Sequence, residues 1–183
     1  MSNLEEKQIE REEIFEGNVL HVVRDTVELP NGKAAEREVC LHIGAVAVIP
    51  ITDDGKVIVE NQYRYARGRV FLEIPAGKLD SADEIPLEAA KRELREETGA
   101  VAEKFTYLGK ITPSPAVLSE VIHLYLAEGL KFGERDLDED EFLDVTEIPL
   151  EELHRMVLAG KIEDAKTQIA VLKAFAIKIL QIT

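Results

Sequence analysis

The sequence of 183 residues is poor in cysteine, in aromatic residues and in long apolar runs. Because Cys40 is the only cysteine, the chain can form no internal disulfide bond and no zinc site built from several thiolates. The longest apolar run, residues 45–51, is far shorter than the ~20 residues of a membrane-spanning helix. Residues 1–13 are charged and lack the apolar core of a secretory signal, so we expect a cytoplasmic location.

Positive charge is also scarce. The chain has 22 Lys and Arg against 36 Asp and Glu, which gives a formal net charge of −14. This balance argues against nucleic acid as a partner, because phosphate binding needs a basic face, and equally against anionic membrane surfaces. Two interpretations remain open. The acidic residues are a solvated surface that keeps the protein soluble, or some of them are clustered to hold divalent cations.

The pattern of apolar residues predicts an α+β fold of one main domain. We expect strands at residues 18–28, 37–43, 45–51, 56–65, 71–74, 105–111 and 121–127, and helices at 86–98, 150–158 and 164–180. Turn residues 53–55 (Asp-Asp-Gly) predict that the strands on either side pair as a hairpin. The strongly acidic segment 133–144 is expected to be a loop.

The helix at residues 86–98 carries the clearest chemical signal. Glu93, Glu96 and Glu97 are three and four residues apart, so they share one helix face and repel one another. Arg92 and Arg95 could offset that repulsion on an ordinary solvated surface. Alternatively, the carboxylates bind Mg²⁺ or Mn²⁺, hard cations that prefer oxygen ligands.

Residues 77–99 favour the second interpretation, because they resemble the Nudix box. Gly77, Glu84 and the run Arg-Glu-Leu-Arg-Glu-Glu-Thr-Gly at residues 92–99 match its pattern of a glycine, a spaced glutamate and R-E-aliphatic-x-E-E-x-G. Two departures occur. Six residues rather than five separate Gly77 from Glu84, so Asp83 competes for the glutamate position; we prefer Glu84 because its spacing to Arg92 is that of the family. Ala100 is a weak match to the closing aliphatic residue.

The resemblance extends over residues 18–175 and is to the ADP-ribose pyrophosphatase branch of the Nudix hydrolases. The similar segments are residues 62–65, 72–80 and 160–167, with Pro115 and the pair Ser119-Glu120 at the familiar spacing. This implies a Nudix fold, a mixed sheet sandwiched between helices, over residues 43–183. It also implies a small antiparallel β region at residues 1–42 that is exchanged between the subunits of a homodimer.

The resemblance assigns the metal ligands. Glu93 and Glu97 would bind divalent cations and serve catalysis, and Ala76 would contribute its backbone carbonyl. Glu96 and Glu141 are further ligand candidates.

Other roles are implied for groups near these ligands. Glu139 would be the general base that activates water, while Glu84 and Arg92 would pair and orient the helix. The assignments of Glu139 and Glu141 depend on the spacing to Val145, and a solvated charge run remains the alternative for this loop.

The substrate contacts implied by the resemblance lie outside the box. Arg64 would bind a phosphate, although a surface arginine at a strand end would look the same. Glu120 would accept hydrogen bonds from ribose hydroxyls, and Arg37 and Glu38 would reach the partner subunit's site. With so few aromatic residues, we place no adenine pocket.

The function implied is hydrolysis of the diphosphate of ADP-ribose to AMP and ribose 5-phosphate. The implied cofactor is Mg²⁺, with Mn²⁺ or another divalent ion as the alternative. One alternative is another nucleoside diphosphate sugar, or a related diphosphate, as the substrate. A second is a non-catalytic ADP-ribose or nucleotide sensor, against which the intact glutamates argue. A third is a simple Ca²⁺-binding protein, although the acidic loop has no EF-hand pattern.

Overall fold

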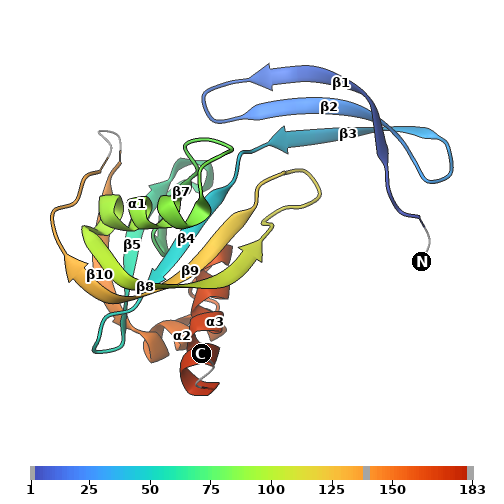
Figure 1. Ribbon diagram of the computed structural model, residues 1–183. Helices are drawn as coiled ribbons and strands as arrows, with labels where there is room; N and C mark the ends of the chain where they lie inside the picture. Colours follow the sequence, from blue (N-terminus) through green and yellow to red (C-terminus); the bar gives the residue numbers. More distant parts are fainter. Residues whose placement is uncertain (1–2, 138–140, 181–183) are drawn as a thin grey trace. The chain divides into compact units, whose positions relative to one another are not determined.

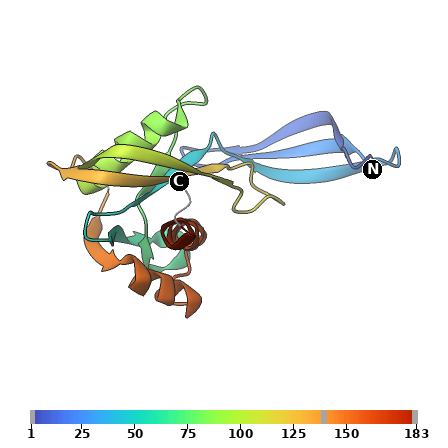
Figure 2. The same cartoon turned by 60° about the horizontal axis from the view of Figure 1, so that its bottom comes forward.

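The computed structural model describes residues 3–137 and 141–180, which form two compact units (Figures 1 and 2). The first unit comprises Met1–Ile43 and Thr112–Val121, and the second Gly44–Ile111 and Ile122–Thr183. The predicted division into residues 1–42 and 43–183 stays a prediction. Among the described residues, no helix is long and apolar enough to cross a membrane.

The first unit is an antiparallel sheet of three strands in the order β1-β2-β3: Lys7–Glu16, His21–Glu28 and Ala34–Leu41. The pattern of apolar residues did not predict β1, which is exposed along its whole length. Segment Thr112–Val121 is tied to the end of β3, where Cys40 N–H donates to the Val117 carbonyl oxygen at 2.8 Å.

The second unit contains two sheets. The larger has the order β7-β4-β9-β8, with strands Ala76–Lys78, Ala45–Pro50, Ile122–Phe132 and Ala100–Ile111. It is mixed, because β4 runs parallel to β9 and antiparallel to β7. The smaller has the order β10-β5-β6, with strands Leu143–Pro149, Lys56–Arg64 and Arg69–Glu73. A short 3₁₀ turn, Tyr65–Arg67, joins β5 to β6.

Helices cover both faces of the larger sheet. Since side chains alternate along a strand, Val46 and Val48 of β4 pack against α1 (Pro86–Thr98), while Ala47 and Ile49 face the other way. That opposite face packs against α2 (Leu150–Leu158) and α3 (Ala165–Leu180). Figure 2 shows α1 on one side of this sheet and the α2–α3 pair on the other. The expected α+β architecture, a mixed sheet between helices, is therefore confirmed.

One pairing prediction is wrong. Strands β4 and β5 do not form a hairpin, because they belong to different sheets. Between them, an isolated bridge joins Ile51 to Val57, and the Thr52 N–H donates to the Lys56 carbonyl oxygen at 2.9 Å. Instead β4 lies between β7 and β9, and β5 lies between β10 and β6. Strand β10 was not predicted either; its first two residues fall in the expected acidic loop.

Candidate active site

Helix α1 directs two of the predicted glutamates into the protein. Pro86 occupies the first turn, where its missing N–H costs nothing, and Gly99 ends the helix with φ 72° while donating its N–H to the Arg95 carbonyl oxygen. Leu94 packs in the core beneath the helix. The adjacent side chains of Glu93 and Glu97 are 8% and 2% exposed. They are therefore not part of a solvated acidic surface.

The segment between β6 and α1 approaches both glutamates. The Ala76 backbone N–H donates to Glu97 Oε2 at 2.9 Å, so the residue predicted as a carbonyl ligand adjoins Glu97. A Cβ atom added to Gly77 would meet the Glu93 carboxylate at 2.1 Å. A glycine is required here because the carboxylate occupies the space of a side chain.

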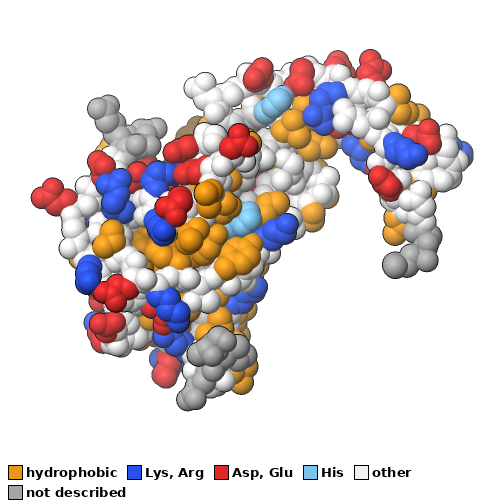
Figure 3. Space-filling model, in the orientation of Figure 1, with side chains coloured by type: hydrophobic (Ala, Val, Ile, Leu, Met, Phe, Trp, Pro, Cys, Tyr) orange, Lys and Arg blue, Asp and Glu red, His pale blue; other side chains and the backbone are white. Residues whose placement is uncertain are grey.

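Arg92 connects the outer carboxylates. Its Nη1 donates to Glu93 at 2.7 Å and to Glu96 at 3.2 Å, and its Nε donates to Glu84 at 3.3 Å. Glu84 also accepts the Asp80 N–H at 2.6 Å, so the predicted pair links the preceding loop to the helix. Acidic and basic side chains alternate over α1 in Figure 3.

The buried carboxylates favour their neutral forms. Burial is the main cause that raises the pKa of Glu97 to about 10, and the negative charges of Glu60, Glu93 and Glu141 add to it. Burial likewise raises the pKa of Glu93 to about 7, although Arg92 opposes this shift. Such repulsion means that the fold holds these groups together without enough positive charge to balance them.

The late acidic loop is described only in part. Glu139, the predicted base, lies outside the described residues. Glu141 is described and half-buried, and its charge acts on Glu60, Glu93 and Glu97 alike. Within residues 3–137 and 141–180, no three acidic, histidine or cysteine side chains are already arranged to hold a metal ion.

Arg64, the predicted phosphate ligand, is engaged by the protein itself. Its Nε and Nη2 donate to the two carboxylate oxygens of Glu73 at 2.8 and 2.6 Å, which raises the pKa of Arg64 further. Lys166, in the first turn of α3, pairs with the same glutamate. The side chain of Arg64 is still 41% exposed. Its contacts are thus compatible with both earlier interpretations.

Three other predicted substrate residues belong to the first unit. Arg37 forms a two-point ion pair with Glu6, at 2.8 and 2.6 Å. The Glu38 carboxylate lies 3.7 Å from Arg24, and the Glu120 carboxylate lies 3.8 Å from the His42 ring. Inside this unit, all three therefore have charged or titratable neighbours.

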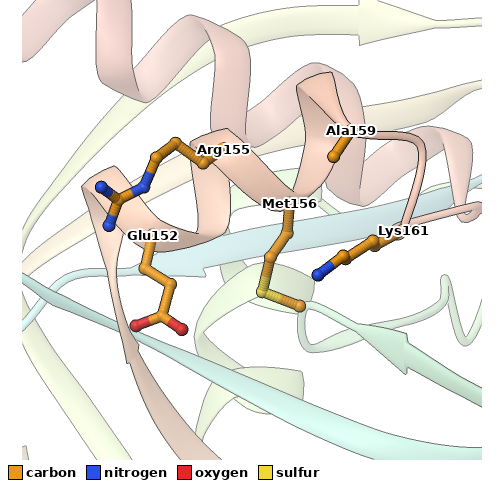
Figure 4. A pocket seen from close by; sticks show the side chains of 5 residues that line it. All are labelled: Glu152, Arg155, Met156, Ala159 and Lys161. Atoms are coloured by element: carbon orange, nitrogen blue, oxygen red, sulfur yellow. The ribbon is translucent and has the colours of Figure 1, made fainter.

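Sequence reasoning missed Glu60, which is 1% exposed on β5 and has a pKa raised to about 7, mainly by burial and the charge of Glu73. A glutamate in an alternating strand gives no signal of burial, because such residues usually face water. A surface hollow of about 270 Å³ lies beside α2, lined by Glu152, Arg155, Met156, Ala159 and Lys161 (Figure 4). None of the predicted site residues lines it.

Comparison with known proteins identifies the family. Residues 41–170 match the NUDIX domain, and residues 6–40 match the nucleoside diphosphate sugar hydrolase N-terminal domain. The chain is 46% identical to the ADP-ribose pyrophosphatase of Bacillus subtilis (strain 168), over all of this chain and 96% of that protein. It is also 46% identical to the methanol dehydrogenase activator of Bacillus methanolicus, over 91% of each chain.

A solved structure supports the fold. The crystal structure of an ADP compounds hydrolase superposes with a TM-score of 0.85 over 99% of this chain and 98% of that one, at 24% sequence identity. The family match covers the α1 glutamates, the preceding glycine segment and both sheets of the second unit. The chain belongs to the Nudix hydrolase family.

Proposed function

We propose that the chain hydrolyses the diphosphate of ADP-ribose to AMP and ribose 5-phosphate, with a divalent cation, Mg²⁺ or Mn²⁺, as cofactor. The observation that carries this proposal is the buried, mutually repelling group of carboxylates around Glu93 and Glu97. The full-length similarity to an ADP-ribose pyrophosphatase supports the choice of substrate.

The donor chemistry fits a hard divalent cation. Glu93 and Glu97 offer carboxylate oxygens from one helix face, Glu141 acts on both from the late loop, and Ala76 adjoins Glu97. Burial and the neighbouring negative charges raise the pKa values of Glu93 and Glu97, so the ionised carboxylates need a positive charge at this place. A cation would supply it, and each carboxylate would then be ionised when it binds. We propose Glu93, Glu97, Glu96, Glu141 and the Ala76 carbonyl as the ligands.

A bound cation would neutralise the charge of the diphosphate and make water easier to deprotonate. The chain's residues then supply orientation and proton transfer. Glu139 takes the proton from the attacking water as general base. Arg92 and Glu84 fix α1 against the preceding loop, so that the carboxylates of Glu93 and Glu97 stay in place.

We also propose residues that contact the substrate. Arg64, oriented by its two-point pair with Glu73, binds a phosphate oxygen through the exposed part of its guanidinium group. Glu120 binds ribose hydroxyls, and Arg37 and Glu38 act at the partner subunit's site.

The assembly we propose is a homodimer that covers the first unit. Its apolar side chains are widely exposed: Ile9, Ile14, Phe15, Val19 and Leu20 are each between 45% and 65% accessible. Burying such residues against a second copy would stabilise both chains. Light scattering of the purified protein at several concentrations would test this; a monomer throughout would contradict it.

A second candidate substrate is another nucleoside diphosphate sugar. The match of residues 6–40 to the N-terminal domain of nucleoside diphosphate sugar hydrolases favours it. The same carboxylates would bind the cation for this substrate, because the cation contacts the diphosphate. Other residues would determine which sugar is accepted.

Hydrolysis of a panel of nucleoside diphosphates with Mg²⁺ tests the proposal. We expect the highest kcat/KM for ADP-ribose, with AMP as a product. Faster cleavage of another nucleotide sugar would favour the second candidate. If ADP-ribose binds but no diphosphate is cleaved, the protein is a sensor and the proposed activity is wrong.

A further inference from the structure

Glu60 is the least exposed charged side chain among the described residues, although it lies outside the Nudix box. It is on β5, the middle strand of its sheet, so the backbone on both sides is paired with β10 and β6. Val57 and Val59 face the core shared with α2 and α3. By alternation Glu60 points to the opposite side of the strand, away from that core.

The Glu60 carboxylate is not satisfied by the protein. Its Oε2 atom is buried and has no hydrogen-bond partner in the described part of the chain. Glu73 lies directly opposite Glu60 on β6 and is almost as deeply buried, but its carboxylate has hydrogen-bond partners. Both oxygens of Glu73 are bound by Arg64 or Lys166. The nearby cationic side chains thus donate to Glu73, and Glu60 gains only their longer-range attraction.

A buried carboxylate oxygen without a hydrogen-bond partner is costly to a fold, so a purely structural role does not account for Glu60. Its electrostatic surroundings indicate another role. Its negative charge acts more strongly on Glu97 than that of any other side chain, and Glu141 in turn acts on Glu60. Glu60 therefore belongs to the same group of carboxylates as the helix glutamates, but enters it from a strand of the other sheet.

We propose that Glu60 is part of the divalent-cation site and supplies it with a further negative charge. This inference rests on the proposed function, since Glu93 and Glu97 must hold the cation. This role explains why the Glu60 Oε2 atom has no hydrogen-bond partner among the described residues: the positive charge that would balance it is that of the bound cation. The Nudix box, residues 77–99, assigns no such role to β5.

Mn²⁺ binding to the substrate-free protein, measured by calorimetry, tests the inference. Glu60→Gln removes the charge and keeps the shape, and we expect it to weaken Mn²⁺ binding at least about tenfold. Glu147→Gln is the matched control, since Glu147 lies on the adjacent strand β10 but is solvent-accessible and paired with Lys56. It should bind Mn²⁺ like the wild type. Unchanged affinity in Glu60→Gln would overturn the inference.

Thermal unfolding gives a second readout that does not depend on activity. In chelator, Glu60→Gln should melt at or above the wild-type temperature, and it should gain less from added Mn²⁺. The glutamine amide of Glu60→Gln could itself destabilise the fold. Glu60→Met, which is apolar and of similar length, avoids this problem and should show the same two changes. A lower melting temperature in chelator for both variants, with the full gain from Mn²⁺, would mean that Glu60 is structural only.

Glu97→Gln separates this inference from the proposed function. If Glu97→Gln loses Mn²⁺ binding while Glu60→Gln keeps it, the inference about Glu60 is wrong and the proposed site stands. If the wild type itself binds no Mn²⁺, the metal-dependent function and the inference both fail.

Discussion

Replacing Gly77 by alanine should impair the active site more than the fold. The new Cβ atom would lie 2.1 Å from Cδ and Oε1 of Glu93 and 2.3 Å from its Oε2. Real Cβ atoms essentially never approach heavy atoms closer than 3.0 Å, so the carboxylate must move by about 0.9 Å or more. The backbone at Gly77 has no positive φ, so alanine adds no backbone strain.

The displaced group is the far end of a flexible side chain, which limits the cost to the fold. A side chain forced off its preferred rotamer costs on the order of 0.5–1.5 kcal/mol. Catalysis is more sensitive, because a misplacement of ~1 Å can lower the rate about 10²-fold. We therefore expect kcat/KM for ADP-ribose to fall about 100-fold, while the melting temperature in chelator falls by only a few degrees.

The assay compares three proteins at saturating and at limiting Mg²⁺. Gly133→Ala is the matched control, since Gly133 also lacks a positive φ and its added Cβ would meet only the Gly99 carbonyl oxygen, at an ordinary 3.6 Å. It should retain wild-type activity. If Gly77→Ala folds and keeps wild-type kcat/KM at limiting Mg²⁺, the position of the Glu93 carboxylate does not govern catalysis, and the site is misassigned.

Three further outcomes are expected. Glu97→Gln should lower kcat/KM at least about 100-fold, which a kinetic assay checks. It should fold like the wild type in chelator, which a melting curve checks, because at neutral pH a carboxyl with a pKa of about 10 is already uncharged. The pKa of Glu93 is about 7 in the folded protein, against an ordinary value of 4.5. Its contribution to the free energy of unfolding is therefore full below about pH 4.5 and is lost as the pH rises through 7. In chelator, the part of the stability that depends on Glu93 should therefore fall by on the order of 2–3 kcal/mol between about pH 5 and about pH 8. Glu93→Gln should lose that much less stability than the wild type over this range; equal slopes would contradict the assigned pKa. Arg64→Ala leaves the buried Glu73 with one cation fewer and should cost about 1–3 kcal/mol, whereas Arg64→Lys should recover stability but not kcat/KM if Arg64 also binds phosphate.

Local sequence signals predicted α1 well. Pro86 and Gly99 bound the helix as expected, since each acts through its own backbone geometry and needs no distant partner. The glutamates at residues 93 and 97 were correctly placed on one face. The helix pattern could not predict their burial, because Gly77 lies against Glu93 and Ala76 lies against Glu97 only in the folded chain.

Strand pairing was less predictable. Residues 53–55 form a turn, and such a turn usually joins two strands of one hairpin. Here β4 pairs in parallel with β9, more than 70 residues along the chain, and β5 is drawn to β6 and β10. Which strands pair depends on which apolar faces the helices cover. The residues of a turn cannot predict this. The same limitation hid β10 and the burial of Glu60.

The negative charge of the chain thus has two physically different parts. Exposed residues such as Glu12 and Glu151 are surrounded by water, so they cost the fold little. Glu60, Glu93 and Glu97 are all buried, and the charges of Glu60 and Glu93 both raise the free energy of the ionised state of Glu97. A fold that gathers such groups is less stable than one with apolar residues in their place, unless something binds them. Binding a cation there must therefore stabilise the folded state by mass action, so the stability gained on adding the cation should follow the metal affinity in variants of these three residues.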